Sequence, residues 1–467
     1  MQGVLDASVT ELAASLRAGR LSPLDLIDAH IARATALNPT LCAVVGQRFD
    51  AARQEALAAE ARLLSAPRGA PLPPLLGVPF TAQEAVGVAG QPETGGSVYR
   101  WDAVSTRDST AIARLRAAGA IPMAVTNVPE GGLWLETNNL VYGRTNNPWN
   151  SQHTAGGACG GEAALIAAGG SPFGIGSGLL SAAVVPAAFC GVAAYQPTAA
   201  LAPRATGWPA AHLGCGLLAR RCADLHLLGP VLTGQPPAAP PPDDLAGRTV
   251  YVLDGFPGVR IAAPVAEALG RAAAALEERG ARLAPLSLPG LEAAQAIWGA
   301  MLAERLPQEI SALLGDGQSV PVLREALRFP LGRANHTSSA LILAVLETIR
   351  RTLPQRGGDL LADGAALRHT LEEALGRDGV LLHPPYSRPA PRHRGTLVTP
   401  FDGLLSGLFA VMGMPSAVAP IGFDVSGLPL AAQLTAARGR DTLPMDAAAH
   451  LEAAFGGWVR AQPQAVG

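Results

Sequence analysis

Residues 149–197 read WNSQHTAGGACGGEAALIAAGGSPFGIGSGLLSAAVVPAAFCGVAAYQP. This stretch combines a glycine-rich turn, a helix of small residues, a second glycine-rich loop and a further apolar element. Positions 163–203 carry no charged side chain, so we expect them in the core, and the Gly and Pro interruptions exclude a plain membrane span. Backbone N–H groups gathered at the two glycine clusters can hold an anionic oxygen. The stretch therefore predicts the floor of an active site.

Apolar residues on both sides of this stretch alternate between the spacings of helices and of strands. Ser22-Pro23 suits an N-cap followed by the first helical residue. The pattern predicts helices over 9–37 (broken at Gly19), 51–64, 109–118, 264–279, much of 291–375, 401–412 and 441–455. It predicts strands over 41–45, 75–81, 121–125, 248–253, 281–286, 379–383, 415–420 and 429–434. Such alternation is typical of an α/β fold.

The composition is that of a folded protein with a large core, because 49% of the 467 residues are hydrophobic and 15% are charged. A net charge of −2 gives no basis for nucleic-acid binding. All 35 basic residues are Arg, so the chain has no side-chain amine for catalysis. The five Cys show no metal-ligand spacing. They indicate reduced thiols and no metal, and with no secretion signal we expect a cytoplasmic protein without a membrane span.

Five blocks in order resemble the amidase signature family of Ser-Ser-Lys amide hydrolases, its fatty acid amide hydrolase branch in particular. They are GVPFTAQEAVGVAG (77–90), TNVPEGG (126–132), YGRTNNPWN (142–150), TAGGACGGEAALIAAGGSP (154–172) and GMPSAVAPIGFDVSGLPLAAQL (413–434). The resemblance implies one amidase-signature domain over 1–467, an α/β fold with a large mixed, mostly parallel β-sheet flanked on both faces by α-helices. Within it we expect a helical region (1–66), a signature core (67–232), a Pro-rich loop (233–247) and a C-terminal α/β region completing the same sheet (248–467).

The resemblance also implies where the family's catalytic groups would stand. In that family a nucleophilic serine attacks the amide, a second serine preceded by a cis peptide bond relays protons, and a neutral lysine is the base. The lysine position is Gln83, the relay position is Ala158 and the nucleophile position is Ala182. The family's Asp-x-Gly-Gly-Ser run is replaced by residues 178–182, which read GLLSA, and the Arg that follows the nucleophile is replaced by Val184.

These replacements predict that Ser-Ser-Lys hydrolysis is lost. Alanine offers no nucleophile, and a glutamine amide is not a useful base near neutral pH. The hypothesis is a catalytically degenerate amidase, a pseudoenzyme that keeps a small-molecule pocket for an acyl, aromatic or amide-like ligand and needs no cofactor. Two roles stay open, namely binding of a ligand or partner (including a second copy) and a different reaction, such as cyclisation or condensation in a biosynthetic pathway. We expect an apolar pocket lined by Gln83, Trp134, Thr137, Ala158, Cys159, Leu179, Leu180, Ser181 and Ala182.

The alternative function is an amide hydrolase with a relocated nucleophile, either Cys159 or Ser181. Cys159 stands where a glycine turn enters a helix, which can activate a thiol, but a small buried residue suits the position better. His153 is on the same loop and could orient the thiol, whereas Ser181 more readily faces away from the reaction centre. Glu84 could act as an acid or base, but we favour a structural carboxylate bonded to loop N–H groups.

Overall fold

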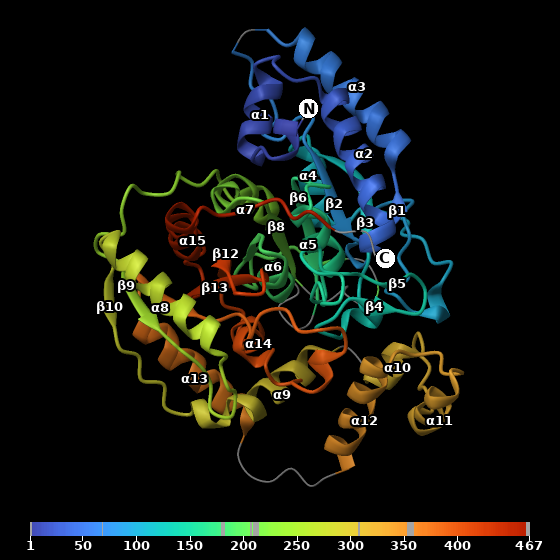
Figure 1. Ribbon diagram of the computed structural model, residues 1–467, viewed down its shortest axis with the longest axis vertical. Coiled ribbons are helices and arrows are strands. Elements are labelled where there is room, and N and C mark those ends of the chain that lie inside the picture. The colour runs from blue at the N-terminus through green and yellow to red at the C-terminus, as the bar shows by residue number, and fades with distance from the viewer. Residues whose placement is uncertain are drawn as a thin grey trace.

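In the computed structural model, the described residues are 2–67, 69–178, 183–205, 208, 214–306, 309–352 and 359–463. Within them, eleven strands form one sheet in the order β1-β3-β2-β6-β8-β7-β12-β13-β11-β9-β10 (Figure 1). The strands are β1 Val44–Gln47, β2 Pro79–Gln83, β3 Ile121–Thr126, β6 Phe173–Ser177, β7 Ala193–Gln196, β8 Cys215–Ala219, β9 Thr249–Val252, β10 Arg282–Ala284, β11 Gly379–His383, β12 Ser416–Phe423 and β13 Pro429–Ala436. A separate hairpin pairs β4 Asn138–Asn139 with β5 Gly143–Arg144.

The sheet is mixed, which confirms the expected α/β class. Strands β3, β2 and β6 are parallel, and so are β11, β9 and β10. Antiparallel ladders connect these two blocks through β8, β7, β12 and β13. Because β12 pairs with β7, strands from the last part of the chain complete a sheet begun in the first half.

Helices cover both faces of the sheet (Figure 1). One core cluster joins the sheet to α1, α4, α7, α8 and α15, and two others join its opposite face to α3, α5, α6, α9, α13 and α14. The helices are α1 Val9–Arg17, α2 Pro23–Leu41, α3 Phe49–Ser65, α4 Thr110–Ala117, α5 Gly160–Ala167, α6 Val184–Cys190, α7 Leu225–Thr233, α8 Ala263–Glu278, α9 Ala294–Arg305, α10 Ile310–Leu314, α11 Val322–Arg328, α12 Ser338–Thr352, α13 Leu360–Leu375, α14 Leu404–Val411 and α15 Thr442–Phe455.

The first helices begin as their sequence predicts. The Ser22 hydroxyl accepts hydrogen bonds from the N–H groups of Leu24 and Asp25, and Pro23 is the first residue of α2. Gly19 lies between α1 and α2 with a φ of 65°. Since Gly adopts this left-handed conformation without a steric penalty, the helical pattern breaks there.

The second glycine-rich segment contains strand β6, whereas the sequence predicted a loop there. Gly174 and Gly176 alternate with Phe173 and Ile175, whose side chains pack into the core on one face. On the other face, a Cβ at Gly174 would collide with the Glu162 carboxylate and one at Gly176 with Cys159 Sγ. These glycines therefore let helix α5 lie directly against the strand, a use of Gly in sheets that spacing alone does not distinguish from a loop.

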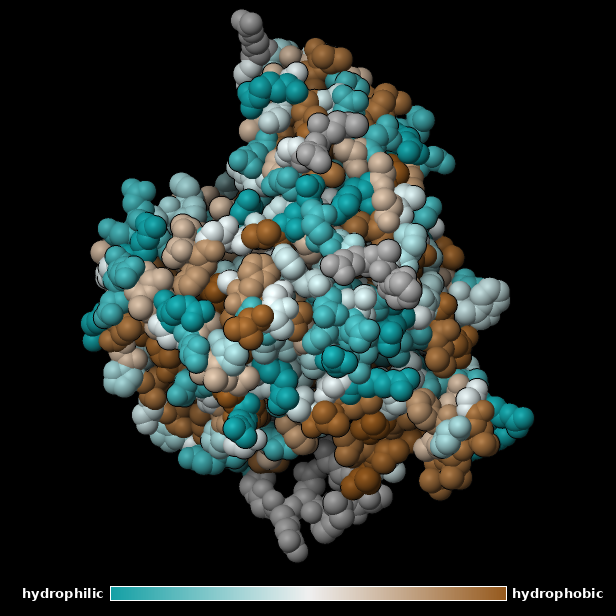
Figure 2. Space-filling model, in the orientation of Figure 1, coloured by the Kyte–Doolittle hydropathy of each residue, from teal (hydrophilic) through white to brown (hydrophobic). Residues whose placement is uncertain are grey.

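One part of the molecular surface is rich in apolar side chains. Exposed apolar side chains gather on α11 and the turn that follows it, where Leu323 is 76% exposed and Leu327 is 70% exposed. Brown residues mark this corner of the molecule in Figure 2. In the described part of the chain, none of the helices has the length and hydropathy that crossing a bilayer requires.

Candidate functional site

The candidate site lies where strands β2 and β6 end side by side. Gln83 is the last residue of β2 and Ser177 is the last residue of β6, and both are buried. The Gln83 side chain donates from Nε2 to the Ala158 carbonyl oxygen over 2.9 Å and accepts at Oε1 from the Ser177 N–H over 2.7 Å. Gln83 thus ties the loop before α5 to the end of β6.

The loop before α5 presents Ala158 to Gln83. The peptide bond between Gly157 and Ala158 is cis, at the position where the resemblance implies one. Thr137 holds this loop, because its hydroxyl donates to the Gly156 carbonyl over 2.8 Å and accepts from the Gly160 N–H over 3.1 Å. Thr137 was predicted to line a pocket. The structure instead gives it 1% exposure and a role in fixing the loop.

The position predicted for the nucleophile is not among the described residues. Ala182 lies outside them, as do Leu179, Leu180 and Ser181. After these residues, Val184 begins helix α6 and is fully buried.

Cys159 is a core residue. It is fully buried at the N-cap of α5, and its Sγ occupies the space above Gly176. Burial raises the pKa of this thiol well above its usual value, and the neighbouring Glu162 and Cys215 raise it further. His153 takes a different partner, since its Nδ1 lies 2.6 Å from the carbonyl oxygen of Ala390. The structure thus shows no contact that would make the two a nucleophile and its base.

Glu84 has the geometry of a structural carboxylate. It is fully buried and accepts from the N–H groups of Thr94 and Gly96 and from the hydroxyls of Thr94 and Tyr142, over 2.9–3.2 Å. Burial raises the pKa of Glu84, although these four hydrogen bonds oppose the rise. With its oxygens used in this way, Glu84 fixes the loop after β2.

Trp134 also belongs to the protein interior. It is 6% exposed, and its Nε1 donates to the Thr396 hydroxyl over 2.8 Å. Glu136 accepts from the same hydroxyl over 2.6 Å and from the Arg394 N–H over 2.8 Å. The contacts fasten the segment that carries Trp134 to residues 394–396.

Glu162, in the GGE of the central stretch, is a buried acid that sequence reasoning missed. Its carboxylate accepts from the hydroxyls of Thr81 over 2.6 Å and Thr126 over 2.9 Å. Burial raises its pKa to about 8, and the two hydroxyls only partly offset this rise. Because these Thr residues stand on strands β2 and β3, far from Glu162 in the sequence, no local motif indicates the cluster.

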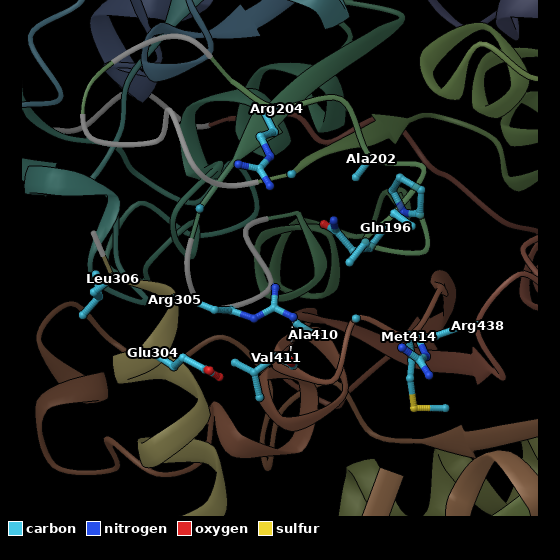
Figure 3. Close-up of a pocket in the computed structure, with 16 residues that line it drawn as sticks. Gln196, Ala202, Arg204, Glu304, Arg305, Leu306, Ala410, Val411, Met414 and Arg438 are labelled. Atoms are coloured by element: carbon cyan, nitrogen blue, oxygen red, sulfur yellow. Dashed lines mark hydrogen bonds between the residues drawn. The ribbon is translucent and has the colours of Figure 1, made fainter. Parts of the chain in front are cut away.

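A cavity of about 630 Å³ opens beside the end of β6. Gly178, which precedes the undescribed residues 179–182, lines it. Its walls come from the loop after β7, the end of α9, the end of α14 and the segment after β13 (Figure 3). None of the described residues predicted to line the pocket is among these residues. The lining is also charged where an apolar one was expected, because it contains Arg204, Arg305, Arg438 and Glu304.

The described residues contain no group of His, Cys, Asp and Glu side chains that could hold a metal ion.

The amino-acid sequence from 25 to 443 matches the family model described as Amidase. The chain belongs to the amidase family. Among relatives in this amidase family, Fatty-acid amide hydrolase 2-B of Danio rerio is 33% identical over 484 residues, which cover 98% of this chain and 91% of the relative. An acylamidase of Rhodococcus erythropolis is 29% identical, with 96% of this chain and 95% of the relative covered.

Solved amidase structures share the same architecture. A crystal structure of an amidase superposes with a TM-score of 0.76 at 27% identity, over 96% of this chain and all of that one (100%). A bacterial aryl acylamidase of the amidase signature family gives a TM-score of 0.77 at 23% identity, over 96% of each chain. These comparisons confirm the predicted amidase-signature fold.

Proposed function

We propose that this amidase-family protein keeps a small-molecule pocket but does not hydrolyse amides by the Ser-Ser-Lys mechanism. The observation that carries the proposal is the buried Gln83 amide, which is hydrogen-bonded at both its nitrogen and its oxygen to backbone groups. An amide in this position has no proton-accepting nitrogen, and Ala158 beside it has only a methyl group. The nucleophile position is Ala182, and the chain contains no lysine that could take over as base.

The described candidates for replacement chemistry favour the same conclusion. Burial raises the pKa of the Cys159 thiol, so little of the reactive thiolate forms near neutral pH. Glu84 accepts four hydrogen bonds in the loop after β2. A ligand-binding role is therefore better supported than a relocated nucleophile at Cys159. The second candidate nucleophile, Ser181, is addressed directly by the experiment below.

The similarity to a fatty-acid amide hydrolase and to an acylamidase supports an acyl compound as the class of ligand. A cavity of about 630 Å³ is in the range that accommodates an organic ligand. We propose that residues 1–467 act as one domain, since β12 and β13 join the same sheet as β1–β8.

The test is an assay of the purified protein with oleamide, phenylacetamide and acetanilide, with products measured by mass spectrometry. We expect no acid above the protein-free rate and no labelling by a fluorophosphonate. We expect the same of the variant that carries Gln83→Lys, Ala158→Ser and Ala182→Ser, because Leu180 and Ser181 still replace the two glycines of the oxyanion loop. Acid production by the wild-type protein that disappears in Ser181→Ala or Cys159→Ala would overturn the proposal.

A further inference from the structure

The cavity beside Gly178 carries an excess of positive charge. Arg204, on the loop between β7 and β8, lines the cavity, and so does Arg305, the last residue of α9. Figure 3 shows both guanidinium groups directed into the same space, with the Gln196 side-chain amide facing it from the end of β7. Three hydrogen-bond donors from separate segments therefore converge on one region, which is the arrangement that recognises an oxyanion.

The two arginines differ in how they are held. Arg305 donates through Nη2 to the Val411 carbonyl over 2.7 Å, which fixes its direction and leaves its other N–H groups available. Partial burial lowers the pKa of Arg305, and the neighbouring Glu304 only partly opposes this shift. The Arg204 side chain has no hydrogen-bond or ion-pair partner within the described ranges. A charged side chain that lines a cavity and has no such partner is available to bind a ligand.

A second cavity of about 490 Å³ continues the first, since both are lined by Ala199, Ala200, Arg305, Gly413 and Arg438. It adds Arg368 and Arg440, and one further acid, Glu372. Glu372 already accepts from Arg438, over 2.6 Å at Nε and 3.1 Å at Nη2. Positive charge is therefore in excess along the whole groove, although the chain as a whole has a net charge of −2.

The remaining wall of the first cavity is apolar. Leu306, Val411 and Met414 line it together with small residues. A ligand that satisfies both parts of the lining has an anionic group and a compact hydrocarbon or aromatic body. Gly178 places this site directly before the positions that replace the family's oxyanion loop and nucleophile.

We infer that the groove binds an organic carboxylate, and that it prefers the acid to the uncharged amide of the same shape. An amide and its acid differ by the group that faces Arg204 and Arg305, and only the acid can form hydrogen bonds with both in which donor and acceptor are both charged. The inference rests on the proposed function insofar as both assign a ligand to this cavity. It adds that the ligand is of the chemical class released by amide hydrolysis rather than the class consumed.

Isothermal titration calorimetry with two matched pairs tests this inference, phenylacetate against phenylacetamide and octanoate against octanamide. We expect at least one acid to bind roughly ten-fold or more tightly than its amide, an affinity difference that one charge-assisted contact supplies. Arg204→Gln should weaken binding of that acid by a similar factor. Arg17→Gln, which removes an exposed charge on α1, should leave it unchanged.

The outcomes separate the inference from the proposed function. Equal binding of acid and amide, binding of neither pair, or acid binding that survives Arg204→Gln would overturn the carboxylate site. Each of these can occur in a protein that hydrolyses nothing, so they leave the loss of hydrolysis standing. Conversion of phenylacetamide to phenylacetate during the titration would instead overturn the proposed function, whichever compound binds more tightly.

Discussion

The amide nitrogen of Gln83 lies 2.9 Å from the carbonyl oxygen of Ala158, and its amide oxygen accepts from the Ser177 N–H at the same time. A protonated lysine could make only the first contact, because an ammonium group donates and cannot accept. A side-chain amide is therefore suited to connect a carbonyl with an N–H group in the protein interior. In this chain the position serves as a structural tie between two backbone segments.

Removal of this tie should reduce stability. Gln83→Ala leaves the Ala158 carbonyl and the Ser177 N–H buried without partners, and we expect the free energy of unfolding to fall by about 2 to 4 kcal/mol. Chemical denaturation measures the change. The matched control is Gln54→Ala on the exposed side of α3, which should change stability by less than about 0.5 kcal/mol. Equal effects of the two substitutions would contradict the importance of the tie.

Glu162 should give stability a specific pH dependence. Burial raises its pKa in the folded state to about 8, above the usual value of 4.5, so the folded protein holds a proton that the unfolded chain releases. Its contribution to stability is complete below about pH 4.5 and is lost as the pH rises through 8. Glu162→Gln keeps a neutral side chain of the same shape at every pH.

The measurement is the free energy of unfolding of both proteins between pH 5 and pH 9. Because other buried acids titrate in both, the difference between wild type and Glu162→Gln isolates the carboxyl group. We expect that difference to move in favour of the variant as the pH rises. A difference that stays constant over the range would mean that Glu162 titrates normally.

Alkylation should distinguish Cys159 from the partly exposed Cys42. Burial raises the thiol pKa of both, but Cys159 is fully buried and its pKa is raised well above the usual value, whereas Cys42 is only half-buried. With iodoacetamide at pH 7.5, we expect the native protein to react first at Cys42 and to leave Cys159 unmodified. Peptide mass spectrometry reads out both sites, and the protein unfolded in urea shows that each can react. Rapid, stoichiometric labelling of Cys159 in the folded protein would support the relocated-nucleophile alternative.

The adjacent arginines 220 and 221 should differ sharply in their effect on stability. Arg220 is fully buried and donates to the carbonyl oxygens of Ala7 over 2.9 Å and Gly169 over 3.4 Å, and burial lowers its pKa to about 9. We expect Arg220→Met to cost about 3 kcal/mol or more, because it leaves these carbonyls unpaired and the nearby Asp224 without a positive neighbour.

The control, Arg221→Met, removes a side chain that is 33% exposed and lies 3.9 Å from Glu452. Its cost should be about 1 kcal/mol or less. Thermal unfolding of both variants checks the contrast. Similar losses in both would mean that burial of Arg220 does not set its importance.

Much of the fold could be predicted because its signals are local. Ser22 and Pro23 indicate the start of α2, and the strands predicted from residue 248 onward coincide with β9 to β13. The adjacent arginines 220 and 221 are alike in the sequence, but only Arg220 is fully buried. Its burial depends on Ala7 and Gly169, which are distant in the sequence, and on stacking against Trp458. No local pattern contains that information.

The candidate site, like the fold, could be predicted only in part from the sequence. The resemblance located Gln83 and Ala158, which the structure joins by a hydrogen bond. It gave no indication of the basic groove, because Arg204, Arg305 and Arg438 come from three separate segments and are ordinary charged residues in each. Their convergence is a property of the tertiary structure, as is the use of the Thr137 hydroxyl to hold the turn before α5.

The strand order has a consequence for synthesis of the protein on the ribosome. Strand β7 is translated more than 200 residues before its neighbour β12, and β13, which attaches the β11-β9-β10 block, follows β12. Until then, one edge of β7 and one edge of β11 lack their final partners, and exposed strand edges invite association with other chains. The two blocks of the sheet can therefore join only after residues 416–436 have been synthesised.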